Sequence, residues 1–153
     1  MSPSTRALFG LVLITALGAL APVNAAQAGS NPLIRVCVTN GGQFEAQPDN
    51  QDEIALCRWG SAIVDSQTLL SNLNEVQSEA AAVLLNDVTS PDCAALGAVN
   101  WTINSTTRSP ETVCTFNDSS RLSLALAISA PDSTVRVLLK DILAPHPQPA
   151  PHT

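Results

Sequence analysis

The side chains with most scope for chemistry are four cysteines, Cys37, Cys57, Cys93 and Cys114. Neighbouring cysteines lie at least 20 residues apart, whereas zinc sites take ligand pairs two to four residues apart. The spacing therefore argues against a metal site, and the even number favours disulfide bonds. Four cysteines allow three pairings, and their number alone does not choose among them.

Histidine chemistry is confined to the end of the chain, because His146 and His152 are its only histidines. The rest of the sequence therefore cannot form a Ser-His-Asp triad, a Cys-His pair or a histidine metal site. It also lacks the G-x-S-x-G, glycine-rich phosphate-binding and H-E-x-x-H motifs. These absences predict a protein without catalytic residues, cofactor or metal.

Carboxylates offer the one catalytic alternative. Asp49, Asp52 and Glu53 occur together in "PDNQDE", and Asp118 follows in the second half of the chain. A calcium loop would have D-x-D-x-D-G spacing, and this segment has no glycine. A hydrolase would need two of these acids across a cleft, within about 10 Å. The sequence has only two tryptophans and no tyrosine to line a sugar-binding cleft, so a solvated hairpin turn is the simpler interpretation.

The N-terminus has the layout of a secretory signal peptide, over residues 1–25. Arg6 precedes an uncharged segment, residues 7–21, and small residues suited to cleavage follow. That segment would span about 22 Å as a helix, less than the roughly 30 Å of a bilayer core. We expect an exported protein, periplasmic or secreted, whose mature chain does not insert into the membrane.

The chain is acidic, with thirteen Asp and Glu residues against seven Lys and Arg, and a net charge of −6. Lys140 is its single lysine. Nucleic acids and anionic lipids are bound by basic surfaces, so both are disfavoured as partners and a basic protein is favoured. The alternative is that the charge serves solubility alone. The oligomeric state is left open.

Two segments share a pattern that indicates a degenerate tandem repeat, residues 31–86 and 90–143. Each begins with a polar residue and proline, and has a glycine four residues after its first cysteine. In each, an aromatic residue follows two positions after the second cysteine. The matching positions are Asn31-Pro32 with Ser90-Pro91, Gly41 with Gly97, and Trp59 with Phe116. The repeat predicts one disulfide within each unit, Cys37–Cys57 and Cys93–Cys114.

The first unit reads as a helix, a hairpin and a second helix. Pro32 suits the first turn of a short helix, and Gly41 suits its end. Residues 43–47 and 53–59 are expected to form strands joined by the turn-rich "PDNQD". Apolar residues then recur with alternating spacings of four and three, which predicts one main amphipathic helix over about 66–85.

The second unit reads mostly as antiparallel strands. Strands are expected at 99–106 and 111–117, and the alternation in "RLSLALAIS" predicts another at 121–129. Residues 134–143 are assigned to a strand, with a helix as the alternative. The proline-rich tail, 144–153, is expected to be disordered. The expected fold is a small disulfide-stapled α+β protein in which the helix packs across an antiparallel sheet.

The motifs "NPLIRVC", "CVTNGG" and "CRWGSAIVD" resemble the DUF333 family over residues 31–72. These are small exported bacterial domains, loosely labelled haemolysins, and residues 90–130 would be a degenerate second copy. This chain departs from the family where a further cysteine is expected, since Ile63 stands near that position, and it has no tryptophan in the following helix. The resemblance implies an exported domain of unsettled function with no catalytic residues to carry over.

Together these features predict a non-enzymatic binding module for a protein partner, with an inhibitor of a cationic envelope or secreted hydrolase as its sharpest form. The expected contacts are Asp49, Asp52 and Glu53 at one hairpin tip and "RSPE" at the other. Trp59 would be an aromatic anchor if it were exposed. A structural cell-envelope protein is the non-enzymatic alternative.

Overall fold

The computed structural model describes residues 31–49, 52–74 and 76–144. The expected signal peptide, residues 1–25, lies outside the described residues. So do His146, His152 and all of the expected disordered tail except its first residue.

The first described element is helix α2, Pro32–Thr39, and it begins and ends as its sequence suggests. The Asn31 side chain accepts a hydrogen bond from the Leu33 N–H at 2.9 Å, and Pro32 occupies the first turn. Gly41 follows with a φ of 76°, which most residues avoid. These local signals place Cys37 on the buried side of a short helix.

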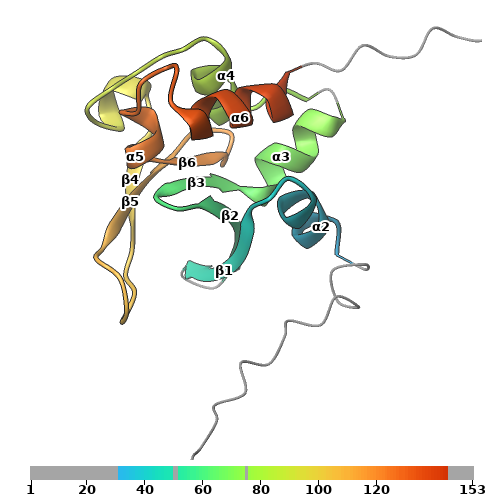
Figure 1. The fold of residues 1–153 in the computed structure, drawn as a ribbon. Helices are drawn as coiled ribbons and strands as arrows, with labels where there is room; N and C mark the ends of the chain where they lie inside the picture. Colours follow the sequence, from blue (N-terminus) through green and yellow to red (C-terminus); the bar gives the residue numbers. More distant parts are fainter. Residues whose placement is uncertain (1–30, 50–51, 75, 145–153) are drawn as a thin grey trace, which may run out of the picture.

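Six strands form one curled antiparallel sheet in the order β1-β2-β3-β6-β5-β4 (Figure 1). The first three are β1 (Gln43–Asp49), β2 (Asp52–Trp59) and β3 (Ala62–Asp65), and the other three are β4 (Val99–Ile103), β5 (Glu111–Thr115) and β6 (Arg121–Ser123). The halves of the chain meet in the middle of the sheet, where Val64 of β3 pairs with Leu122 of β6. The expected fold class, a disulfide-stapled α+β protein with an antiparallel sheet, is confirmed.

The helices are α3 (Ser66–Leu73), α4 (Glu79–Leu85), the 3₁₀ turn η1 (Ala94–Leu96), α5 (Leu124–Ala127) and α6 (Thr134–Leu143). The main core contains residues of α3, α4, α5 and α6 together with Val64 and Leu122 of the central strands. A smaller cluster uses the opposite face, where the curl brings β2 and β3 toward β4 and β5. Its buried members are Ile54, Leu56, Ile63, Ile103 and Val113.

The helical segment expected over 66–85 is divided into α3 and α4. The break coincides with the part of the apolar stripe that the core does not cover, because Leu73 is 50% and Val76 is 60% exposed. Asn74 closes α3, and Ser78 accepts a hydrogen bond from the Ala81 N–H at the start of α4. Two short helices can both pack on the curled sheet, whereas one long straight helix would lose contact with it.

One expected strand is too long, and another is wrong. Within 121–129, only Arg121–Ser123 is a strand, and α5 follows at once because the Ser123 Oγ accepts from the Leu126 N–H at 3.3 Å. Residues 134–143 form α6, the helical alternative, which buries Arg136, Leu139 and Leu143. The second unit therefore ends in helices and is not mostly strands.

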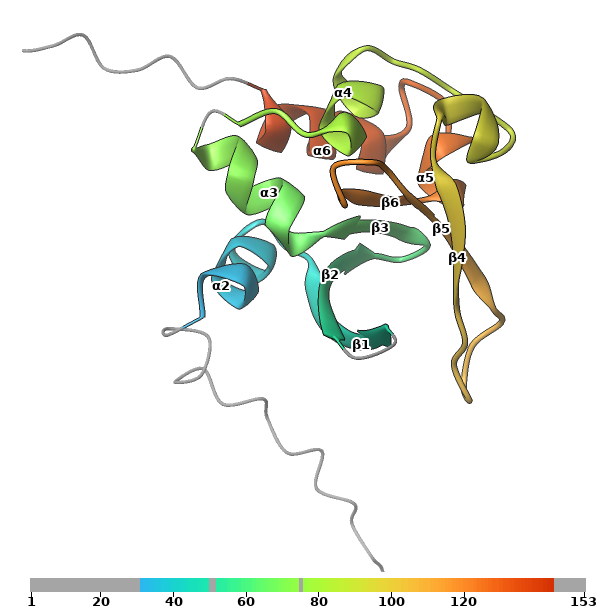
Figure 2. The ribbon, with the colours of Figure 1, turned by 180° about the vertical axis from the view of Figure 1, so that it is seen from behind.

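The two halves follow one plan, with a helical turn, three strands and a capped helix in each. The predicted cysteine pairing is present in both. Cys37 of α2 is bonded to Cys57 of β2, and Cys93, beside η1, is bonded to Cys114 of β5. The sheet order places the halves about an approximate two-fold axis between β3 and β6 (Figure 2). The first unit has a third strand, β3, that its sequence pattern did not predict, and the tandem repeat stays a prediction.

Candidate functional site

A groove of about 550 Å³ lies between β2, α3, the segment before α4 and the turn that precedes β6. Its apolar lining comes from Leu33, Ile54, Ala55 and Val76. Its charged lining comes from Glu53, Asp65, Asp118 and Arg121. The remaining lining is hydroxyl and amide groups. The groove therefore combines an apolar surface with an excess of acidic side chains.

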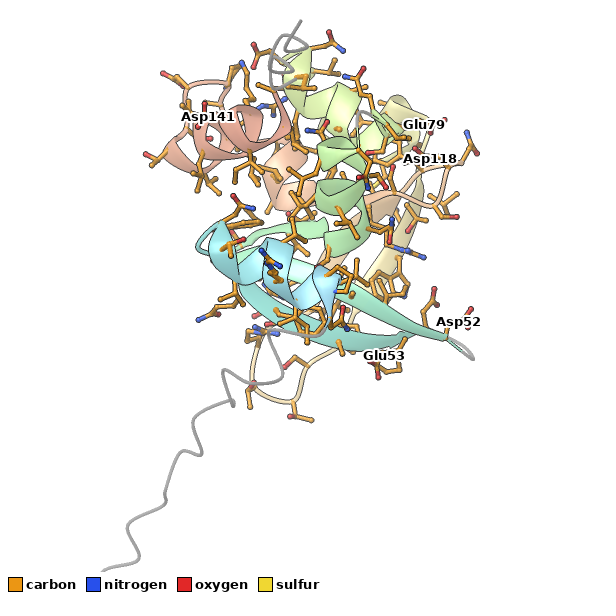
Figure 3. The ribbon with its side chains drawn as sticks, turned by 90° about the vertical axis from the view of Figure 1, so that its right-hand side faces the viewer. Asp52, Glu53, Glu79, Asp118 and Asp141 are labelled. Atoms are coloured by element: carbon orange, nitrogen blue, oxygen red, sulfur yellow. A yellow bond between two sulfur atoms is a disulfide. The ribbon has the colours of Figure 1, made fainter. Side chains whose placement is uncertain are left out.

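Asp118, which lines the groove, lies beside Glu79 (Figure 3). Its Oδ2 accepts from the Glu79 N–H at 2.7 Å, and its Oδ1 accepts from the Ser120 N–H and hydroxyl. Burial acts to raise its pKa, but these hydrogen bonds outweigh burial and lower it. Asp118 is consequently a stable carboxylate, which suits charge recognition and does not suit a general acid.

Asp65 is buried at the inner end of the groove. Burial raises its pKa, and hydrogen bonds from Thr68 and from the Arg121 N–H oppose that rise. Both carboxylate oxygens are occupied, since Oδ2 accepts from the Thr68 N–H and Oδ1 accepts from the Thr68 hydroxyl and the Arg121 N–H. These bonds cap α3 and tie it to β6, which is a structural role.

The predicted carboxylates are only partly brought together. Glu53 and Asp118, distant in sequence, line the same groove, whereas Asp49 and Asp52 do not line it. Asp52 and Glu53 are exposed at the start of β2. Asp49 forms an ion pair with Arg121, with its Oδ2 3.5 Å from Nη2.

Trp59 is packed within the protein. Its ring is partly buried against the main core, and its Nε1–H donates to the Asn40 carbonyl at 3.2 Å. The ring also lies where a side chain on residue 42 would point, so Gly42 is needed beneath it. These contacts hold the end of α2 on the sheet and give no support to an exposed aromatic anchor.

The "RSPE" segment takes part in an internal ion network that the sequence did not reveal. At its centre is Arg58, a β2 residue 4% exposed. Its Nε lies 2.9 Å from Glu45 Oε1 and its Nη1 lies 2.6 Å from Glu111 Oε1. Arg108 pairs with the same Glu45 at 2.7 Å. The hydrogen bond from Arg108, with those from Arg58, outweighs burial and lowers the pKa of Glu45 to about 2.

Arg136 is a second buried cation, and it binds backbone carbonyls. Its guanidinium donates to the carbonyls of Val83 and Val88 and to those of Leu126 and Ser129, near the ends of α4 and α5. Burial lowers its pKa, and a carboxylate, Asp87, lies at the edge of contact, 4.0 Å from Nε. The only sequence signal for Arg136 is its place in "TVRVLLKDIL", where it stands in line with Leu139 and Leu143 on the apolar side of the helix.

The ion pairs leave the surface charge one-sided. Within the part of the chain that the structure describes, five of the six cations form ion pairs with carboxylates, namely Arg58, Arg108, Arg121, Arg136 and Lys140. The sixth, Arg35, forms none. Eight described acids lie outside such pairs, one of them the buried Asp65. The others are Asp52, Glu53, Glu79, Asp92, Asp118, Asp132 and Asp141, all exposed.

Among the described residues, no cluster of three or more His, Cys, Asp or Glu side chains could hold a metal ion. No described helix has the length and apolar character needed to cross a bilayer. Comparison with family models, curated proteins and solved structures gives no match. The site is therefore interpreted from the geometry and charge of this chain.

Proposed function

We propose that this protein is an exported, non-enzymatic binding module whose partner is a basic protein. One observation carries the proposal. Most of the described cations are used inside the molecule in ion pairs, while seven exposed acids have no such partner. A surface of this kind attracts a cationic partner and accelerates its approach.

The proposed contact face runs from the β1–β2 hairpin across the groove to the start of α4. Asp52 and Glu53 lie at one end of this face, and Glu79 and Asp118 lie at the other (Figure 3). Between them the groove offers the apolar surface of Ile54 and neighbouring residues. Cationic side chains have apolar stems and charged heads, so this combination fits a Lys- or Arg-rich segment.

The scaffold supports the same proposal. Two disulfides fix the start of each half to its hairpin, and little conformational freedom remains to be lost on binding. Disulfides persist in oxidising compartments, which supports export. An inhibitor of a cationic secreted or envelope hydrolase, built on a DUF333-like unit, is the most specific form of the proposal.

The carboxylate hydrolase receives less support. Glu53 and Asp118 share the groove, but Asp118 has a lowered pKa and Asp65 uses both oxygens to cap α3. A hydrolytic pair needs an acid that can release a proton to the leaving group. We assign no catalytic role to these residues.

The test is affinity capture of exported proteins by the immobilised chain at about 0.05 M and about 0.5 M salt, which differ in electrostatic screening. We expect a basic protein to be captured at low salt and released at high salt. The double substitution Asp52→Lys with Glu53→Lys should abolish capture. Asp132→Lys with Asp141→Lys makes the same charge change away from the face and should preserve most of it.

Two results would contradict the proposal. The first is a failure to retain any basic protein at low salt, which would favour a structural envelope role. The second is a partner whose binding ignores salt and survives the substitutions at Asp52 and Glu53.

A further inference from the structure

The sheet has two edge strands, β1 and β4, and their sequences protect them to different degrees against pairing with another chain. An exposed edge can pair with another chain, and charged residues or proline usually prevent this. β1 carries all of these features, since its seven residues include Glu45, Pro48 and Asp49. Proline cannot donate a backbone hydrogen bond, so β1 is a poor template for a further strand.

β4 has none of these protections. Its sequence, "VNWTI", contains no charge and no proline, and four of its five residues favour strands. Val99 is 71% exposed, and Asn100 and Thr102 are exposed as well. Among the described residues β4 pairs only with β5, and the strand runs along the margin of the molecule (Figure 2).

We propose that β4 is the pairing edge for a second copy of this chain. Two β4 strands would join antiparallel about a two-fold axis and extend the sheet from one molecule into the next. This inference is independent of the proposed function, because it uses the unpaired backbone edge of β4 and none of the acidic side chains.

The strand itself identifies the occupant. A pair centred on Trp101 would set Asn100 opposite Thr102 of the copy, so no charge would oppose a like charge. Trp101 packs on the small cluster that contains Ile103, and alternation places Val99 on that side of the strand. The second copy would therefore cover the most exposed apolar side chain of the edge. A basic segment would find no carboxylate on β4 to pair with.

The association should be weak and should depend on salt in a particular direction. A five-residue edge contributes less area than a stable interface needs. Each copy carries a net charge of −6, so two copies repel at low ionic strength. Added salt screens that repulsion and should strengthen the pairing, whereas it should weaken the binding of a basic partner.

Sedimentation velocity of the exported chain, from about 10 μM to about 1 mM, tests this inference across the range of a weak interface. We expect the average mass to rise toward that of a dimer with concentration, and more steeply at high salt. Asn100→Lys with Thr102→Lys opposes lysine to lysine across the two-fold and should hold the chain as a monomer. Gln43→Lys with Ala46→Lys, which makes the same charge change at two exposed positions of β1, should leave dimerisation intact.

Amide NMR spectra of the unsubstituted chain give a second readout that needs no variant. Signals from Val99 to Ile103 should broaden or shift with concentration before those of β1. A monomer at every concentration and salt would overturn the inference. So would dimerisation that is lost in the β1 variant and kept in the β4 variant, or concentration-dependent shifts confined to another surface.

Discussion

At the scale of single residues, the paired glycines after Cys37 have separate reasons. Gly41 adopts a positive φ at the end of α2. Gly42 is fixed by packing, because a Cβ there would collide with Cys57 Sγ and lie 3.0 Å from Cys37 Sγ. The glycine pair in "CVTNGG" thus allows the chain to leave the helix and cross its own disulfide.

The ion network around Arg58 predicts a pH dependence that belongs to Glu45. Its pKa is about 2 in the folded protein and ordinarily 4.5, so the unfolded chain binds the proton more tightly. The stabilisation is complete above pH 4.5 and is lost as the pH falls toward 2. After allowance for solvent screening, we expect Glu45→Gln to lower the unfolding free energy by about 2 kcal/mol at pH 7. Urea unfolding at pH 7 and pH 3 measures the change.

The difference between the unsubstituted chain and Glu45→Gln isolates this residue. Asp65 has a raised pKa, so its effect has the opposite sign, and stability rises as the pH falls through its folded pKa. The difference should be largest at pH 7 and should shrink at pH 3. An equal loss at both values would contradict the assignment. Glu53→Gln, which removes an exposed acid from the same hairpin, is the charge control and should cost less at pH 7.

At the scale of elements, two helix caps also join the halves of the sheet. Asp65 caps α3 and accepts from the Arg121 N–H, two residues before Ser123. Ser123 caps α5 and accepts from the Ile63 N–H, two residues before Asp65. The side chain that caps a helix in one half therefore also accepts a backbone hydrogen bond from the central strand of the other half. This reciprocal contact supplements a β3–β6 pairing with one matched position, Val64 with Leu122.

These shared caps predict that a substitution in one half exposes a backbone amide in the other half. Asp65→Ala and Ser123→Ala should each lower the unfolding free energy by about 2 kcal/mol, because each leaves buried N–H groups without partners. Amide hydrogen exchange distinguishes their effects. Asp65→Ala should deprotect Arg121 and spare Ile63, and Ser123→Ala should do the reverse. Loss of amide protection confined to the half that carries the substitution would contradict this prediction.

At the scale of the whole molecule, each half has its own disulfide, and the halves share one core. The bonds enclose similar stretches, with sequence separations of 20 and 21 residues. Their cysteines are all buried in the main core, so neither bond is a surface addition. The two halves should therefore depend on their disulfides to a similar degree.

We expect removal of either disulfide, by Cys37→Ala with Cys57→Ala or Cys93→Ala with Cys114→Ala, to cost about 3 kcal/mol, mainly through the unfolded chain. Equilibrium denaturation of both variants measures the two losses. The matched loop lengths make each variant the control for the other. A large loss from one pair and none from the other would show that the halves are not equivalent.

The sequence by itself determined the features that depend on near neighbours. The Asn31 cap, the Pro32 start, the Gly41 end and the hairpins follow from turn chemistry and alternation. The disulfide pairing followed from the repeated spacing of cysteine, glycine and aromatic residues. The α+β class was set by the same patterns. These signals depend on residues close together in the chain, so they can be identified from the sequence alone.

Only the tertiary structure decided the rest. β3, "AIVD", is buried along its whole length, so it shows no alternation and was missed. "LALA" fits both periods, and the Ser123 cap chose the helix. Arg58 and Arg136 read as ordinary surface cations, yet their partners lie up to 53 residues away. The groove joins Glu53 to Asp118 for the same reason: burial and pairing across the sheet depend on which distant segments meet, and a single sequence does not state that.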